Sequence, residues 1–214
     1  MAVAFVQTAN NSSTTNQVIV TITTSASNIV YVATALDGTR TVSSITDTGG
    51  SAYTKHNSRS NGVYSSGIWS AYNVAASTSV TINLSAAGNN AVVVGEYSGG
   101  AMRGATARAS GLTADPTVSV TTIDRNNWVV ASFETSDGTA PTAKTGNLRG
   151  TSVIGTAVGC ALNDNTAAAP GAVTNAVTHA ASTWACCGSE VRTTATASSY
   201  QLTRSGGMIG KKFV

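Results

Sequence analysis

The sequence predicts an all-β protein, an antiparallel and jelly-roll-like β-sandwich with almost no helix and an extended C-terminal arm. Apolar residues recur at every second position in several segments, and turn residues separate these segments. No segment shows the apolar spacing of an amphipathic helix over two turns, and the good helix formers Glu, Lys and Leu are scarce.

Two kinds of strand are expected. Apolar side chains recur at alternate positions in residues 18–22 and 80–84, which predicts strands with one buried face. Residues 29–33, 91–94 and 128–131 are denser apolar runs, rich in β-branched side chains. Such runs are typical of strands that are covered on both faces, so these three are the expected core strands.

Turn sequences lie between the predicted strands, because Gly and Asn adopt the positive φ that tight turns require. The clearest are Asp37-Gly38, Asp47-Thr48-Gly49-Gly50, Gly88-Asn89-Asn90, Ser98-Gly99-Gly100 and Asp137-Gly138. No internal repeat of fixed period is visible. The two halves, roughly residues 1–97 and 112–193, are similar in style, and we expect them to be the two strand sets of one sandwich.

One β-sandwich domain is expected over residues 1–193, since no charged or proline-rich linker divides the chain. The alternation stops there, and residues 194–214 are expected to form an extended basic arm that contacts other subunits. Its expected contact residues are Tyr200, Leu202, Arg204, Met208, Ile209, Lys211, Lys212 and Phe213. The alternative for this segment is a tail that makes no contact.

The composition favours a packed or extracellular setting. Charged residues are only 10% of the 214, against about a quarter in an average domain. A polar but weakly charged surface is typical of virion parts and packed assemblies. Residues 1–190 carry eight basic and nine acidic side chains, so no basic surface for nucleic acid is expected. The first residues show neither a signal peptide nor a membrane segment, which predicts synthesis in the cytoplasm.

Four segments carry a family resemblance: SSITDTGGSAYTK at 43–55, GIWSAYNVAASTSVTINLS at 67–85, AVVVGEYSG at 91–99 and NNWVVASFETSDG at 126–138. Their order resembles a β-sandwich, jelly-roll-like module of phage structural proteins and some bacterial secreted proteins. Trp184 stands in a place similar to that of the module's last-strand tryptophan. The chain departs from the pattern at Gly50-Ser51, where Asn-Thr is usual, and in its basic arm. The resemblance implies a fold and carries no catalytic signature.

Asp47-Thr48-Gly49 matches the triplet of aspartic proteases, in which two carboxylates share one proton and activate water. Gly50 stands where Ser or Thr is expected, and Asp-Thr-Gly-Gly is also a turn sequence. A hairpin turn is therefore the favoured interpretation. Gly206 to Lys212 resembles a phosphate loop, but three residues rather than four separate Gly206 and Gly210.

His56 and His179 are the only histidines, so a Ser or Cys nucleophile would need one of them as its base. No serine lies in a Gly-x-Ser-x-Gly segment, and we interpret both histidines as exposed or sheet-face side chains. Cys186 and Cys187 are adjacent and point to opposite faces of a strand, which disfavours zinc; a bridge from Cys160 to either stays open. No catalytic, cofactor-binding or metal-binding residue is predicted.

Tyr53, Tyr64, Trp69 and Tyr72 gather around one predicted hairpin and are candidate ligand-facing aromatics, since aromatic faces beside polar loops suit sugar rings. Core packing explains the same residues. Trp69 shares one strand face with Ala71, and Tyr72 lies on the other, so at most part of this set can be exposed.

The sequence thus favours a non-enzymatic virion structural protein of a tailed phage, either a capsid decoration (cement) protein or a head or tail fibre component. It would be made in the host cytoplasm and assemble through its sheet surfaces and its arm, as a homotrimer and with other virion proteins such as the major capsid protein. No nucleic acid, membrane or cofactor is expected, and surface polysaccharide is a further candidate partner. The alternative is a secreted bacterial carbohydrate-binding or adhesin module, which would be extracellular.

Overall fold

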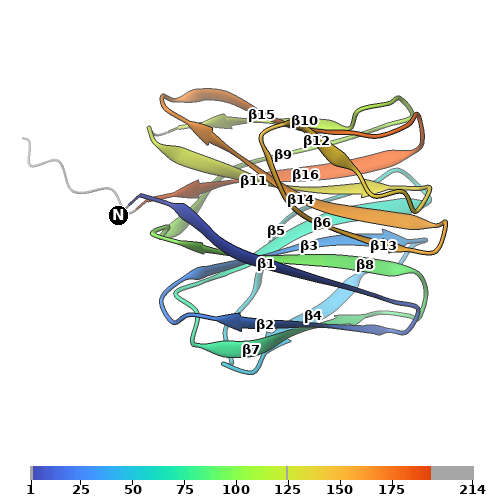
Figure 1. The fold of residues 1–214 in the computed structure, drawn as a ribbon, viewed down its shortest axis with the longest axis horizontal. Helices are drawn as coiled ribbons and strands as arrows, with labels where there is room; N and C mark the ends of the chain where they lie inside the picture. The colour runs from blue at the N-terminus through green and yellow to red at the C-terminus, as the bar shows by residue number, and fades with distance from the viewer. Residues whose placement is uncertain (1, 124, 194–214) are drawn as a thin grey trace, which may run out of the picture.

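The computed structural model describes residues 2–123 and 125–193, and the description below covers these residues. They form sixteen β-strands and no helix, and all strand pairs are antiparallel (Figure 1). The predicted all-β sandwich is therefore confirmed. The predicted arm, residues 194–214 with its contact residues, lies outside the described residues.

The first half of the chain forms a five-stranded and a three-stranded sheet. Its strands are β1 (Ala4–Ser13), β2 (Gln17–Thr24), β3 (Ile29–Asp37), β4 (Val42–Asp47), β5 (Thr54–Ser60), β6 (Tyr64–Tyr72), β7 (Ser77–Leu84) and β8 (Asn90–Ser98). The five-stranded sheet has the order β1-β8-β3-β6-β5 and the three-stranded sheet the order β2-β7-β4. We call them the first inner sheet and the first outer sheet.

The second half repeats this arrangement. Its strands are β9 (Met102–Gly111), β10 (Thr117–Thr122), β11 (Asn127–Thr135), β12 (Thr142–Thr145), β13 (Asn147–Ile154), β14 (Val158–Ala167), β15 (Gly171–Thr178) and β16 (Trp184–Arg192). The second inner sheet has the order β9-β16-β11-β14-β13, and the second outer sheet has the order β10-β15-β12. Adding eight to each strand number of the first half gives the strand orders of the second half. The chain therefore contains two topologically identical units.

Within each unit the chain passes back and forth between the inner and outer sheets, which is the connectivity of a jelly roll. The expectation that each half supplies one strand set of a single sandwich is wrong, because each half builds both of its own sheets. The second unit also begins at Met102, ten residues before the expected boundary. A sequence read for fixed-period repeats does not reveal such a duplication when the two copies differ in most side chains.

The two units pack through their inner sheets, which gives four layers in the order outer, inner, inner, outer (Figure 1). Tyr31 and Ile68 of the first inner sheet share one core with Val130 and Leu162 of the second. Separate cores lie between each inner sheet and its outer sheet. The central inner strands β3, β8, β11 and β16 are therefore covered on both faces.

This layering explains the two sequence patterns. In β2, an outer strand, every second residue is buried, with Val18, Val20 and Ile22 facing the core. In β3, an inner strand, the first eight residues are all buried. The predicted half-buried and core strands are thus confirmed. Apolar residues alternate with polar ones where one face of a strand is covered, and they run continuously where both faces are covered. The predicted turns are confirmed as well, for example by the positive φ of Gly38 (73°) and Gly138 (64°).

A buried glutamate fastens the first unit. Glu96 of β8 is fully buried, and its Oε1 accepts hydrogen bonds from the backbone N of Ser25 (2.6 Å) and from Nδ2 of Asn28 (2.7 Å). Its Oε2 accepts one from Nε2 of Gln7 at 2.6 Å. The carboxylate therefore joins the last strand of the unit to its first strand and to the connection between β2 and β3.

The second unit carries the same clamp. Glu190 of β16 is fully buried and accepts hydrogen bonds from Nδ2 of Asn127 (2.5 Å) and from the backbone N of Ile123 (3.1 Å) through Oε1. Its Oε2 accepts one from the backbone N of Ala105 at 2.8 Å. Glu96 and Glu190 thus do the same structural work at equivalent places, and we call them the glutamate clamps.

Candidate functional site

Asp47 ends β4 and organises a turn. Its Oδ1 accepts a hydrogen bond from the backbone N of Ser51 (2.9 Å), and its Oδ2 accepts one from the hydroxyl of Tyr53 (3.0 Å). The backbone N of Gly50 donates to the carbonyl of Asp47 at 3.2 Å, and Gly50 has a φ of 77°. Burial, together with the nearby carboxylate, raises the pKa of the Tyr53 phenol. These contacts are those of a turn, the interpretation favoured from sequence.

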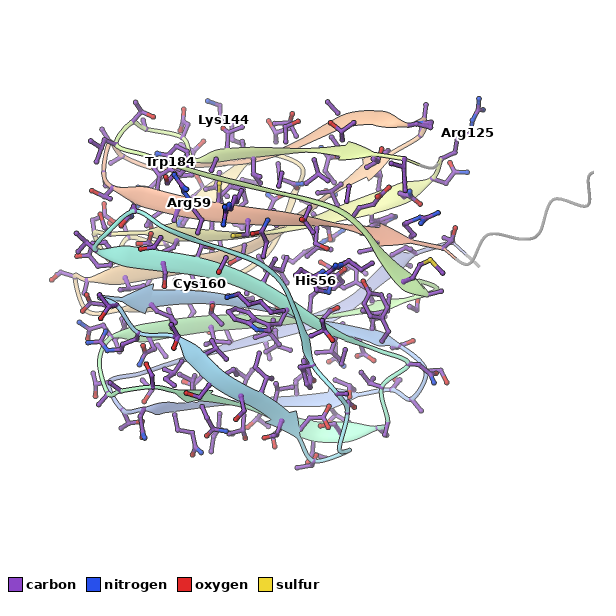
Figure 2. The ribbon with its side chains drawn as sticks, turned by 180° about the vertical axis from the view of Figure 1, so that it is seen from behind. His56, Arg59, Arg125, Lys144, Cys160 and Trp184 are labelled. Atoms are coloured by element: carbon purple, nitrogen blue, oxygen red, sulfur yellow. The ribbon has the colours of Figure 1, made fainter. Side chains whose placement is uncertain are left out.

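His56 joins the two inner sheets (Figure 2). Its Nε2 lies 2.7 Å from Oγ of Ser70, its Nδ1 lies 2.5 Å from Oγ of Ser189, and its ring stacks on Tyr72. Both serines are fully buried. Burial, and to a lesser degree Arg103, lowers the pKa of His56 to about 4, so the ring is neutral at pH 7 and donates to one serine while accepting from the other.

His179 lies in a different environment. Its Nε2 is 2.8 Å from Oδ1 of Asp137, and its Nδ1 is 2.8 Å from the carbonyl of Ala180 and 3.2 Å from Oγ of Ser182. This set of Ser, His and Asp resembles a hydrolase triad in composition. The carbonyl of Ala180, however, can only accept, so its bond with His179 requires a proton on Nδ1, and Nδ1 then cannot take a proton from Ser182. The geometry suits a structural link between two connections.

The three cysteines are buried free thiols. Cys187 belongs to the core between the inner sheets together with Cys160, whereas Cys186 faces the second outer sheet. The prediction that adjacent cysteines point to opposite faces is confirmed. Burial raises the pKa of all three thiols, to about 12 for Cys187.

The four candidate aromatics lie on two faces of the first inner sheet. Trp69 and Tyr53 pack on the side of the first outer sheet. Tyr64 and Tyr72 pack against the core between the inner sheets, where the Tyr72 hydroxyl bonds that of Tyr31 at 2.9 Å. The four rings therefore do not form one platform, and Trp69 is only 8% exposed.

A groove of about 300 Å³ opens beside Trp69. It is lined by Thr34 and Leu36 of β3, by residues 38–42, by Lys55 and residues 58–60 of β5, and by Trp69 and residues 65–67 of β6. Hydroxyl groups, cations and one indole thus face a space large enough for a small molecule. We call it the Trp69 groove.

Gly67 and Thr34 shape its floor. A Cβ at Gly67 would overlap the six-membered ring of Trp69 and would lie 3.1 Å from Oγ1 of Thr34, so glycine is what lets the indole lie flat against β6. Thr34 is fully buried, and its hydroxyl has no hydrogen-bond partner. A buried hydroxyl without a partner costs about 1–3 kcal/mol, which a polar ligand in the groove could recover.

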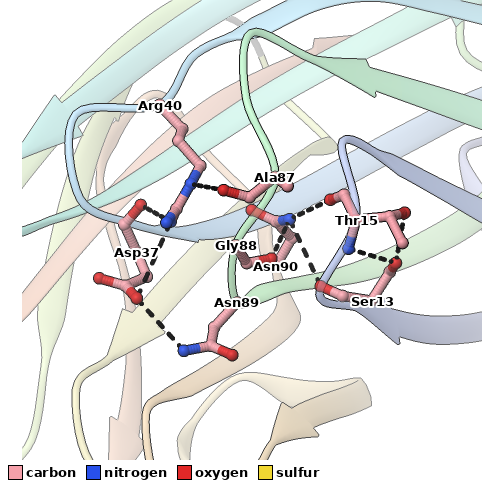
Figure 3. Close-up of polar contacts among 8 residues, drawn as sticks. All are labelled: Ser13, Thr15, Asp37, Arg40, Ala87, Gly88, Asn89 and Asn90. Atoms are coloured by element: carbon pink, nitrogen blue, oxygen red, sulfur yellow. Dashed lines mark hydrogen bonds and ion pairs between the residues drawn. The ribbon is translucent and has the colours of Figure 1, made fainter.

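Arg40 fixes one wall (Figure 3). Its Nε donates to the carbonyl of Ala87 at 2.7 Å, and its Nη1 donates to the carbonyl of Asp37 and lies 3.8 Å from Oδ2 of the same residue. Nδ2 of Asn89 also donates to Oδ2 of Asp37 at 3.2 Å. A Cβ at Gly88 would overlap the guanidinium, so the connection from β7 to β8 passes directly beneath Arg40. This wall is held from two connections at once.

Lys55 supplies the free positive charge, because Arg59 pairs with Ser66 on the opposite strand face and its Nε donates to Oγ of Ser110 in β9 at 2.9 Å. Lys55 pairs with Trp69 and Asn57 pairs with Ile68, so His56 is the extra residue of a β-bulge. The bulge places Lys55 on the groove side, with Nζ 5.9 Å from the Trp69 ring centroid, while His56 turns between the inner sheets. In the described part of the chain, neither Lys55 nor Arg59 takes part in an ion pair.

Within residues 2–123 and 125–193, no three His, Cys, Asp or Glu side chains come together as metal ligands. The same residues contain no helix that is long and apolar enough to cross a bilayer. The phosphate-loop-like segment from Gly206 lies outside the described residues. Comparisons with protein-family models, curated proteins and solved structures found no match.

Sequence reasoning found Trp69 but missed the other residues of the groove. The available signal was a Thr and a Gly, Thr34 and Gly67, inside otherwise apolar core strands. Lys55 gave no signal, because a bulge decides which face it occupies, and no residue pattern in β5 predicts that bulge.

Proposed function

We propose that this protein is a non-enzymatic structural subunit of a tailed-phage virion, a capsid decoration protein or a head or tail fibre component. It would assemble with itself as a homotrimer, and with other virion proteins such as the major capsid protein, through its sheet surfaces and residues 194–214. Its location would be the virion.

The observation that carries the proposal is the pair of jelly rolls joined through a shared inner core. Such a block is a rigid spacer, and the jelly roll is also used by capsid and lectin domains, although that likeness is one of fold alone. Strands β4 and β12 end the outer sheets, and all four residues of β12 are exposed. A strand from another subunit can pair with such an edge.

Light scattering coupled to size exclusion tests the proposal, on the full chain and on a chain ending at Thr193. We expect a trimer or larger assembly for the full chain, weakened by the truncation. Circular dichroism of the truncated chain is the control, and it should retain the β-sheet spectrum. Monomers in both samples would contradict the assembly role.

The second candidate is a secreted bacterial carbohydrate-binding or adhesin module, and the Trp69 groove is the observation that favours it. This reading predicts a monomer that binds polysaccharide. The discriminating result is polysaccharide binding by a chain that shows no assembly in the scattering experiment.

A further inference from the structure

We propose that the Trp69 groove binds an acidic saccharide, a sugar residue that carries a carboxylate. The inference concerns a ligand site and does not depend on how the subunit assembles. It rests on a comparison of the two units, on the charge of the groove and on its unsatisfied hydroxyl.

The second unit serves as an internal reference. Four positions of β3 face the first outer sheet (Val30, Val32, Thr34 and Leu36), and four of β11 face the second (Val129, Ala131, Phe133 and Thr135). The third position is Thr34 in one unit and Phe133 in the other. Thr34 pairs with Gly67, and Phe133 pairs with Ala161.

The same fold therefore closes this space in one unit and opens it in the other. Phe133 is fully buried in the core beneath the second outer sheet, where it fills the volume with an apolar ring. The first unit has instead a short polar side chain, a glycine and, next to Gly67, the indole of Trp69. An apolar residue at position 34 would suit the core better than a hydroxyl without a partner, so stability does not explain Thr34.

The charge of the groove selects the ligand. Lys55 faces the groove without a carboxylate partner among the described residues, and Asp37, the acid nearest to Arg40, is already engaged with that arginine. An anionic ligand is therefore attracted and a cationic one repelled.

The other residues that line the groove favour a saccharide among anionic ligands. The hydroxyls of Thr39, Thr41, Ser58, Ser60 and Ser65 come from residues that line the space and can exchange hydrogen bonds with several sugar hydroxyls. The indole of Trp69 gives an apolar edge for the C–H face of a sugar ring. The carboxylate would then lie beside the Lys55 ammonium, where a charge-assisted bond is strong.

Isothermal titration calorimetry on the full chain tests the site with trigalacturonate and 3′-sialyllactose, each against its neutral counterpart, maltotriose and lactose. We expect at least one acidic probe to bind and both neutral probes to bind about tenfold more weakly or not at all. Binding should weaken as salt is raised, because Lys55 is exposed. The two acidic probes distinguish a uronate from a sialate.

Two variants locate the ligand. Lys55→Gln removes one cation from the groove, and Thr34→Val removes the buried hydroxyl at nearly constant shape; each should weaken binding by about tenfold. Lys144→Gln is the matched control, since this lysine lies in β12 of the far outer sheet, paired with Asp115 (Figure 2). It should leave the affinity unchanged.

Three results would overturn the site: equal affinity for neutral and acidic probes, equal affinity of the Lys55 and Lys144 variants, or no heat with any probe at concentrations on the order of 10 mM. Light scattering reports assembly and calorimetry reports the ligand. Failure of the site and failure of the proposed assembly role are therefore separate outcomes.

Discussion

The three buried glutamates make the sharpest test of how this fold is held together. Replacement of Glu96 by Gln keeps the shape but puts an NH₂ group where a carboxylate oxygen now accepts a donor. Ser25, Asn28 and Gln7 all donate to Glu96, so at least one N–H loses its acceptor. Bonds to a charged group contribute about 1.5–3 kcal/mol each, and we expect a loss of about 2–4 kcal/mol in the free energy of unfolding. Glu190→Gln should cost a similar amount.

Glu134 is the control, since it is equally buried but poorly bonded. Its Oε2 receives a 3.4 Å contact from Nδ2 of Asn61, and its Oε1 has no hydrogen-bond partner. Burial raises its pKa to about 9, although the backbone of Ala185 acts in the opposite direction. The folded chain thus keeps this carboxyl protonated while the unfolded chain ionises near pH 4.5, so its contribution to stability falls as the pH rises from 4.5 to 9. Glu134→Gln abolishes that loss and should be neutral or stabilising at pH 8.

Urea unfolding followed by tryptophan fluorescence measures all three variants at pH 6 and pH 8. The reasoning fails if Glu134→Gln costs as much as Glu96→Gln, or if Glu96→Gln is neutral. Because the two units share one inner core, we expect them to unfold together, with the same dependence of the unfolding free energy on urea concentration in every variant. A changed slope in one variant would show that the units unfold separately.

Three further measurements test other parts of the structure. His56→Gln should flatten the pH dependence of the free energy of unfolding between pH 6.5 and pH 4. In the wild type the lowered pKa makes the unfolded chain take up a proton before the folded chain does, which costs up to about 3 kcal/mol of stability across that window. An unchanged profile would show that His56 is not held neutral. The three thiols should react with Ellman's reagent only in denaturant, since all are buried and burial raises their pKa values; fast labelling of the native protein would contradict this packing. Gly88→Ala should destabilise by about 2 kcal/mol or more, whereas Gly50→Ala, at a positive φ but in open space, should cost about 1 kcal/mol; equal losses in thermal melts would remove the case for a close approach beneath Arg40.

The strands and turns could be predicted because each depends on local pattern. Residues 18–22 alternate since one face is covered, residues 29–33 do not since both faces are covered, and Gly38 marks a turn through its φ. The duplication could not be predicted in this way. Equivalent residues such as Thr34 and Phe133 differ in chemistry, and what the units share is strand order and the clamp at Glu96 and Glu190.

The candidate site depended on facts that no local pattern carries. The bulge at His56 decides that Lys55 faces the groove, and a long-range contact with Ser189 decides where His56 points. The aromatic cluster was visible in the sequence. Its division between two faces depends on the alternation of side chains along β6 and on the presence of a packed layer on each side of that strand. Only Trp69 and Tyr53 lie on the side of the groove.

The two units differ where function is expected and agree where stability is needed. Each keeps a fully buried glutamate that ties the first strand, the last strand and one connection together. Each keeps an inner sheet whose central strands contribute to an apolar core on both faces. The two units differ at the third residue of the central strand that faces the outer sheet. This residue is Thr34, beside an open groove, in the first unit and Phe133, in a filled core, in the second. In a duplicated fold, one unit with a filled core can stabilise the chain while the other unit tolerates a less completely packed core. The Trp69 groove should accordingly bind one ligand per chain, and a stoichiometry of two would show that the second unit holds a site which its apolar filling does not predict.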